Sequence, residues 1–267
     1  MSIYTEKVYQ LWAPHDNEAV ITAYIPHVKK SDCAIVILPG GAYYFRAEHE
    51  GKGYADFFAQ NGILSFVVDY RCRTHHFPTP LLDARRSIQF VRYNAKHFGI
   101  DPTKIAIMGS SAGGHLAALT STYTSPCACN TNDEIDATNY LPNAQILCYP
   151  VIDLVNEQIT HLDTRQNLLG DKPIETAQNL SPHFIATAQT PQAFIWHTFE
   201  DSAVDVRNSL QYASKLKECD VPTELHIFPK GHHGLGLANE NTPIGNHVST
   251  WTTLLLRWLR SIGYINL

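Results

Sequence analysis

A Gly-x-Ser-x-Gly pentapeptide at residues 109–113 constrains the fold of this chain more than any other feature of its sequence. An apolar run typical of a buried strand, residues 104–108, precedes it, and a run of small residues typical of a helix, residues 114–119, follows it. A serine on such a turn projects its hydroxyl out of the sheet at the positive end of the helix, and the glycines leave room for the tight turn. The pattern predicts an αβ unit with Ser111 as a nucleophile; a plain Gly/Ser-rich turn is the alternative.

Strand-like and helix-like patterns alternate through most of the remaining chain. Eight segments look like strands: residues 8–12, 19–25, 33–38, 63–68, 105–108, 144–148, 193–196 and 224–228. Five segments look like helices: residues 54–60, 81–97, 115–122, 204–218 and 248–262. A first pair of strands followed by strand–helix repeats predicts an α/β fold, with a mostly parallel eight-stranded sheet and helices on both faces.

Residues 151–191 break this alternation and contain Gly170, Pro173 and Pro182 among many polar side chains. The stretch is too long for a plain loop in a compact domain. It is either a small lid inserted over the C-terminal edge of the sheet or an irregular surface excursion with one short helix. We see no linker or repeat elsewhere, so we expect one domain over residues 1–267, with 151–190 as the candidate lid.

Composition and charge argue against several classes of function. The formal net charge is −5 without a basic run, so no nucleic-acid partner is expected. No apolar stretch is long enough to span a membrane, the first residues lack the apolar core of a secretory signal, and no Cys-x-x-Cys pair or metal-binding histidine spacing occurs. We therefore expect a cytoplasmic protein with no membrane partner, no metal and no cofactor. The apolar C-terminal segment, residues 251–267, fits either a homo-oligomer contact or a buried helix.

Acyl transfer by a serine needs a base, an acid that orients the base and donors for the oxyanion, and candidates for each follow expected strands. The base candidate is His233 in the Gly-rich loop after the last strand, with His232 as its rival. The acid candidate is Asp201 after the seventh strand, with Glu200 and Asp205 as rivals and a helix N-cap as the plain alternative. The resulting order Ser, Asp, His is the one associated with this turn.

The oxyanion donors are expected to be backbone N–H groups. One belongs to Ala112, which follows the nucleophile, and the others belong to Gly41 and Ala42 in the loop after the third strand. Tyr43 and Tyr44 continue this loop, and we expect their rings to wall the substrate pocket. A simple Gly-Gly turn is the alternative, although aromatic residues directly after such a turn are unusual on a bare surface.

Together these segments resemble the α/β-hydrolase superfamily and, within it, small esterases related to hormone-sensitive lipase and to bacterial acetyl-xylan and feruloyl esterases. The resemblance is carried by residues 39–43, 109–117, the segment around Asp201 and residues 231–234, with support from 69–71, 77–83 and 149–153. The first loop departs from the usual His-Gly-Gly-Gly pattern, since it begins with Pro39 and ends with Ala42, whose N–H can still donate. The large N-terminal helical cap of lipase-like members has no obvious counterpart.

The resemblance implies a serine carboxylesterase that hydrolyses short-chain, acetyl-type esters, acetylated sugars among them, through an acyl-enzyme and without a cofactor. Its expected partner is a small-molecule ester substrate. Two alternatives stay open: an amide-directed hydrolase, such as an arylformamidase or a prolyl-type peptidase, and a hydrolase-shaped protein that binds a small ligand. Proteins of the second kind usually lack a triad member, whereas this sequence offers a candidate for each.

Overall fold

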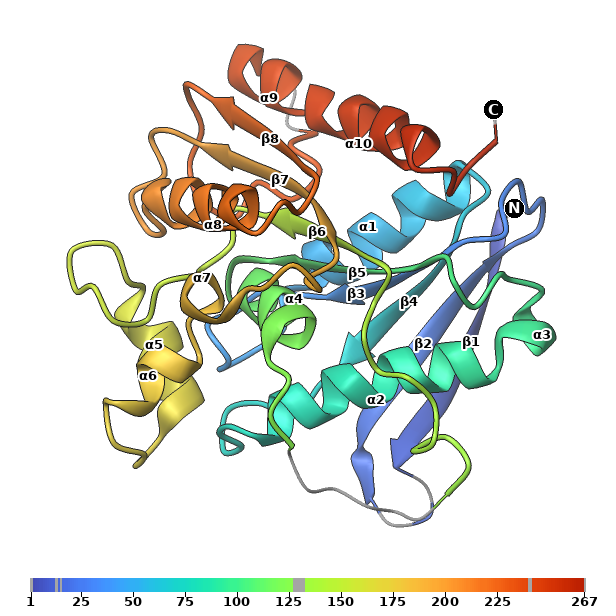
Figure 1. Ribbon diagram of the computed structural model, residues 1–267. Helices are drawn as coiled ribbons and strands as arrows, with labels where there is room; N and C mark the ends of the chain where they lie inside the picture. The colour runs from blue at the N-terminus through green and yellow to red at the C-terminus, as the bar shows by residue number, and fades with distance from the viewer. Residues whose placement is uncertain (1, 13, 15, 127–132, 240–241, 267) are drawn as a thin grey trace.

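The computed structural model describes residues 2–12, 14, 16–126, 133–239 and 242–266, which form an eight-stranded sheet with the order β1-β2-β4-β3-β5-β6-β7-β8 (Figure 1). The strands are β1 (Tyr4–Trp12), β2 (Asp16–Pro26), β3 (Ala34–Leu38), β4 (Leu64–Asp69), β5 (Ile105–Ser110), β6 (Ala144–Cys148), β7 (Gln192–Thr198) and β8 (Thr223–Phe228). Strand β2 pairs antiparallel with β1 and β4, whereas the other neighbouring pairs are parallel. The mostly parallel sheet expected from the sequence is confirmed.

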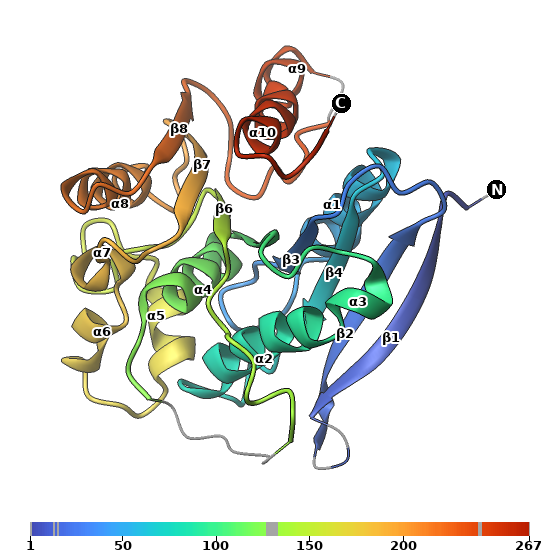
Figure 2. The ribbon, with the colours of Figure 1, turned by 45° about the vertical axis from the view of Figure 1, so that its right-hand side comes forward.

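Helices cover both faces of this sheet (Figures 1 and 2). They are α1 (Glu48–Gln60), α2 (Thr79–Tyr93), α3 (Ala95–Phe98), α4 (Ser111–Thr122), α5 (Leu162–Leu169), α6 (Thr176–Asn179), α7 (Pro182–Ile185), α8 (Arg207–Glu218), α9 (Pro243–Val248) and α10 (Thr250–Ser261). Side chains of β3 alternate between two cores: Ile35 and Ile37 pack beneath α1 and α10, and Val36 packs beneath α2 and α4. Across the described residues, no helix has the length and apolar character needed to cross a membrane.

Several helix boundaries differ from those expected. Helix α1 begins at Glu48 rather than at 54, and α8 begins at Arg207 rather than at 204. The expected helix at 81–97 is two helices, α2 and α3, whereas the one at 248–262 matches α10, and the short helix α9 before it was not expected. The apolar pattern continues from α2 into α3 because both helices pack on the same core, so periodicity alone does not show the break in backbone hydrogen bonding.

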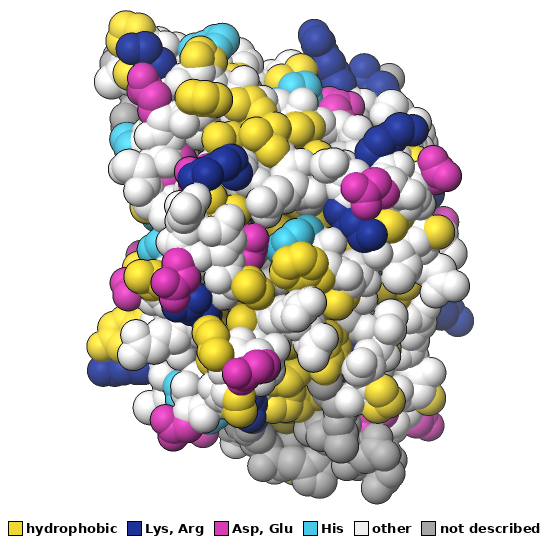
Figure 3. Space-filling model, turned by 60° about the vertical axis from the view of Figure 1, so that its left-hand side comes forward, with side chains coloured by type: hydrophobic (Ala, Val, Ile, Leu, Met, Phe, Trp, Pro, Cys, Tyr) yellow, Lys and Arg dark blue, Asp and Glu magenta, His cyan; other side chains and the backbone are white. Residues whose placement is uncertain are grey.

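The β6–β7 segment, residues 149–191, contains the three short helices α5, α6 and α7 at the C-terminal edge of the sheet. Basic and acidic side chains are interspersed over the face that Figure 3 brings forward. Beneath the surface, Leu168, Ala177 and Leu180 join the core that α2 and α4 cover. Of the two alternatives, the irregular surface excursion with one short helix is wrong, because the segment has three helices and buries apolar side chains. The lid stays a prediction.

Candidate active site

The Ser111 turn, residues 109–113, joins β5 directly to α4. Ser110 ends the strand and Ser111 begins the helix with φ 53°, in the left-handed region that serine rarely adopts. Close backbone approach requires both glycines: a Cβ on Gly109 would lie 2.0 Å from the Gly113 carbonyl oxygen, and one on Gly113 would lie 2.1 Å from that of Leu38. The packed strand and helix therefore enforce the strained turn that places Ser111 at the edge of the sheet.

Two hydrogen bonds connect Ser111 to Asp201 through one imidazole. His233 Nε2 lies 2.8 Å from Ser111 Oγ, and His233 Nδ1 lies 2.6 Å from Asp201 Oδ2. With the proton on Nδ1, the ring donates to the carboxylate and accepts the serine hydroxyl. The three side chains follow β5, β7 and β8, whose C-terminal ends meet at one edge of the sheet. The structure thus brings together the three side chains selected from the sequence.

The rival side chains point elsewhere. His232 is exposed, and its Nδ1 lies 2.7 Å from the carbonyl oxygen of His233. Glu200 and Asp205 form ion pairs with basic side chains outside the Ser111–His233 pair. Within the described ranges, no three His, Cys, Asp or Glu side chains are grouped so that they could hold a metal ion.

Asp201 is held by more than His233. Its Oδ1 accepts the N–H groups of Ala203 and Val204 at 3.0 and 2.9 Å. The fully buried His197 of β7 places Nε2 3.3 Å from Asp201 Oδ2. Burial raises the pKa of Asp201, but hydrogen bonds from His197 and His233 outweigh this and hold the pKa well below its usual range. The carboxylate is therefore both charged and fixed in orientation.

In the β3 loop, residues 39–47, two N–H groups point away from the hydrogen bonds within the loop. The carbonyl of Gly41 accepts the N–H groups of Tyr44 and Phe45 at 2.8 and 3.1 Å, and the carbonyl of Gly40 is also bonded within the loop. A trans peptide points its N–H away from its C=O, so the N–H groups of Gly41 and Ala42 point away from these bonds. Neither N–H donates to another protein atom in the part of the chain that the structure describes. Both are therefore available to a bound oxyanion.

The β3 loop lies beside the Ser111 turn. Strands β3 and β5 are neighbours, with Leu38 opposite Gly109, and a Cβ on Gly40 would lie 3.1 Å from the Ser111 Cβ. Ala112 is the second residue of α4, so its N–H has no acceptor within the helix. The three expected oxyanion donors therefore belong to two segments in direct contact.

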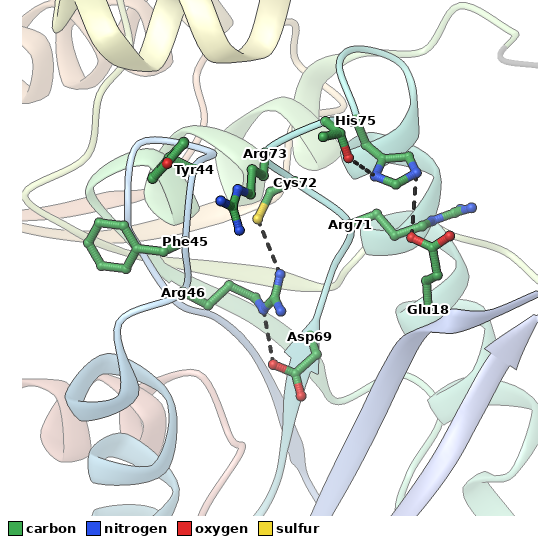
Figure 4. A pocket seen from close by; sticks show the side chains of 10 residues that line it. Glu18, Tyr44, Phe45, Arg46, Asp69, Arg71, Cys72, Arg73 and His75 are labelled. Carbon is green, nitrogen blue, oxygen red and sulfur yellow. Dashed lines mark hydrogen bonds and ion pairs between the residues drawn. The ribbon is translucent and has the colours of Figure 1, made fainter.

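Tyr43 does not line a substrate pocket. Its side chain is fully buried, and its hydroxyl lies 2.8 Å from His115 Nδ1. The expectation that Tyr43 walls the pocket is wrong, because its ring packs in the core against Tyr70 and His115. Tyr44, in contrast, is 53% exposed and lines a cavity of about 450 Å³ (Figure 4).

This cavity lies between the loops that follow β3 and β4. Figure 4 shows Arg73 beside Tyr44, and the guanidinium carbon lies 5.4 Å from the centroid of the Tyr44 ring. Arg46 Nε lies 3.0 Å from Asp69 Oδ1. The remaining lining residues are Glu18, Phe45, Arg71, Cys72, Thr74 and His75. None of the triad residues lines this cavity, so it lies beside the reacting groups and does not enclose them.

A buried hydrogen-bond network connects three loops of the site, those that follow β3, β6 and β8. Glu50, 2% exposed, accepts the Gly40 N–H at 2.8 Å and the Tyr149 hydroxyl at 2.6 Å. The Tyr149 hydroxyl accepts the Gly236 N–H at 2.9 Å, and its ring packs edge-on against His233 with centroids 5.1 Å apart. Glu50 was missed by sequence reasoning, because a glutamate in the first turn of a helix is usually exposed.

The arrangement of Ser111, His233 and Asp201 on this sheet places the chain among the α/β hydrolases. It belongs to the BD-FAE family, whose model matches residues 21–216. It is similar to endo-1,4-beta-xylanase B of Butyrivibrio fibrisolvens (36% identity over 90% of this chain and 38% of the relative) and to the acetylxylan esterase of Xylanibacter ruminicola (33% identity over 88% and 48%). The chain thus spans less than half the length of either relative.

A solved structure resembles the whole chain. The acetyl ester-xyloside bifunctional hydrolase from Caldicellulosiruptor lactoaceticus has a TM-score of 0.89 and 38% sequence identity, with 97% of each chain covered. Both the α/β-hydrolase fold and the resemblance to this group of esterases, expected from the sequence motifs, are confirmed.

Proposed function

We propose that this chain is a serine carboxylesterase that hydrolyses short-chain, acetyl-type esters through an acyl-enzyme intermediate. The observation that carries the proposal is the pair of hydrogen bonds, 2.8 and 2.6 Å, that joins Ser111 to His233 and His233 to Asp201. The similarity to proteins named as an acetylxylan esterase and an acetyl ester-xyloside hydrolase supports the acetyl group as the acyl part.

In the first half-reaction, Ser111 Oγ attacks the ester carbonyl carbon while His233 Nε2 takes the hydroxyl proton. The N–H groups of Gly41, Ala42 and Ala112 stabilise the negative charge that develops on the carbonyl oxygen. The buried carboxylate beside His233 stabilises the imidazolium and keeps the ring in place. When the tetrahedral adduct collapses, the C–O bond to the alcohol breaks and His233 returns the proton to the leaving oxygen.

Water replaces the alcohol in the second half-reaction. His233 removes a proton from the water as its oxygen attacks the acyl carbon, and the same N–H groups stabilise the second tetrahedral adduct. The bond to Ser111 Oγ then breaks, the serine recovers its proton from His233 and the carboxylic acid leaves. Side chains, substrate and water carry every proton and electron pair in this sequence.

The alcohol part of the substrate is proposed to lie along Tyr44. The exposed Tyr44 ring faces the cavity beside the β3 loop, together with Arg73 and the Arg46–Asp69 pair. A ring face flanked by guanidinium and carboxylate groups suits an alcohol with several hydroxyls, because hydroxyls can donate to the carboxylate and accept from the guanidinium. Acetylated sugars are therefore the substrate class that we propose.

A p-nitrophenyl ester series from acetate to long-chain esters, hydrolysed by wild type and by Ser111→Ala, tests the proposal. We expect acetate to be the fastest substrate, because two of the similar proteins are named for acetyl esters. We expect kcat/KM to fall by at least about 10⁴-fold in Ser111→Ala, because the nucleophile is lost. Circular dichroism of both proteins controls for folding.

Different outcomes separate the alternatives. Substantial ester hydrolysis by folded Ser111→Ala would exclude the mechanism, and activity that rises beyond about eight acyl carbons would contradict the short acyl preference. Turnover of formyl-anilides or aminoacyl-proline amides without turnover of esters would favour an amide-directed hydrolase. Ligand binding without any turnover would favour a binding protein.

The cytoplasmic location and the homo-oligomer contact stay predictions.

A further inference from the structure

The β6–β7 segment contacts the β3 loop through a side-chain hydrogen bond. The amide of Asn167, on α5, donates to the Ala42 carbonyl oxygen at 2.8 Å. The Asn167 backbone is itself held, because its carbonyl oxygen lies 2.7 Å from His76 Nδ1 and the Leu168 carbonyl accepts the Phe77 N–H at 2.7 Å. Helix α5 thus links the β3 loop to the loop that follows β4.

A second route from the same segment reaches the next residue of the β3 loop. The Tyr43 hydroxyl bonds His115 Nδ1 at 2.8 Å, and His115 Nε2 lies 2.7 Å from the Leu180 carbonyl oxygen between α6 and α7. Burial lowers the pKa of His115 to about 4, so the ring is neutral near pH 7. A neutral ring donates from Nε2 to Leu180 and accepts the tyrosine hydroxyl on Nδ1.

The β3 loop needs such support because two consecutive residues with a Cβ adopt left-handed backbone. Ala42 has φ 53° and Tyr43 has φ 57°. These conformations are unfavourable for residues other than glycine and persist where the surrounding structure enforces them. The Ala42 N–H and C=O lie in adjacent peptide planes that the φ and ψ of Ala42 join, so a bond that holds the carbonyl restricts rotation about these angles and with it the direction of the N–H.

We propose that Asn167 is a positioning residue, through which the β6–β7 segment holds the β3 loop so that the Ala42 N–H faces the substrate oxyanion. The segment then acts as a brace and not as a lid. This inference rests on the proposed function, since it assumes the role of Ala42 in the esterase reaction. A misplaced N–H weakens stabilisation of the tetrahedral adduct but leaves binding of the ground-state ester intact, so its loss acts on kcat.

The test compares Asn167→Leu, which removes the amide at similar size, with Gln166→Leu at the exposed neighbouring position of α5. We expect Asn167→Leu to lower kcat for p-nitrophenyl acetate by about ten- to a hundredfold, with KM within about threefold of wild type. Affinity for phenylboronic acid, whose serine adduct is tetrahedral, falls by a similar factor. Gln166→Leu leaves both quantities unchanged.

Three results would overturn the inference. A lower Tm with unchanged kcat would mean that the amide only anchors α5, a raised KM with unchanged kcat would point to ground-state binding, and equal losses in Gln166→Leu would show that the bond is not specific. If Asn167→Leu does not fold, Asn167→Asp replaces the donor with an acceptor of the same shape, and we expect it to lower kcat further. Failure of the proposed function looks different: wild type hydrolyses no ester, or Ser111→Ala stays active.

Discussion

At the residue scale, the two carboxylate oxygens of Asp201 have separate partners. Oδ1 accepts two backbone N–H groups at the start of the segment leading to α8, and Oδ2 accepts from His233 and lies near His197. The helix N-cap considered for this residue is wrong, because α8 begins only at Arg207 with Val206 as its N-cap, and the two bonds close a turn before the helix. These turn bonds fix the plane of the carboxylate, so that Oδ2 faces the imidazole.

The two adjacent histidines provide a matched pair of variants. We expect His233→Ala to lower kcat/KM for p-nitrophenyl acetate by at least about 10⁴-fold, because the base is lost. His232→Ala keeps activity within a few-fold of wild type, because that side chain is exposed and the imidazole bonded to Ser111 Oγ is that of His233. Steady-state kinetics of both variants decide the assignment, and comparable losses in the two would contradict it.

Individual residues also show where sequence reasoning stops. Ser111 was identifiable because it lies between Gly109 and Gly113. Both positions need glycine, since strand and helix backbones approach closely there. Nothing in the sequence singled out His197, four positions before Asp201, because a histidine inside a strand can lie on either face of the sheet. The burial of Glu50 was equally hidden, because it depends on Tyr149 and Gly40 from distant parts of the chain.

At the scale of elements, two glycines of α1 experience different surroundings. A Cβ on Gly53 would meet nothing within 4 Å, whereas one on Gly51 would lie 3.1 Å from side-chain carbons of Pro39 and Val67. Glycine inside a helix reduces stability relative to alanine because the unfolded chain has more freedom to lose. The two positions therefore share one helix but differ in packing against the sheet.

We expect Gly53→Ala to raise the free energy of unfolding by about 0.5–1 kcal/mol. Gly51→Ala gains less than this or loses stability, because Pro39 and Val67 must move to admit the methyl group. Urea denaturation followed by circular dichroism measures both changes. Equal gains at the two positions would show that the packing on this face is looser than the structure indicates.

At the scale of the whole molecule, buried histidines link stability to pH. His115 has a pKa of about 4 in the folded chain, lowered from 6.5 by burial, so the unfolded chain binds its proton more readily. The stabilisation is complete above about pH 6.5 and is lost as the pH falls toward 4. Burial also lowers the pKa of His161 and His183, which adds to the same trend.

We expect His115 to account for about 3 kcal/mol of the fall in unfolding free energy between pH 6.5 and 4. His115→Gln, which does not titrate, removes that part of the slope while the contributions of the other histidines remain. Urea denaturation of both proteins at several pH values measures the difference. Parallel pH dependences in the two proteins would show that His115 is protonated in the folded state as readily as in the unfolded one.

Local patterns along the chain were sufficient for the eight strands, for most of the longer helices and for the side chains of Ser111, Asp201 and His233, because strand periodicity and the glycines at 109 and 113 reflect short-range geometry. Contacts between distant segments settled the rest. They directed the Tyr43 ring into the core, and they brought Asn167 to Ala42 across 125 positions. Burial and side-chain direction depend on which segments meet in space, and sequence spacing does not record this.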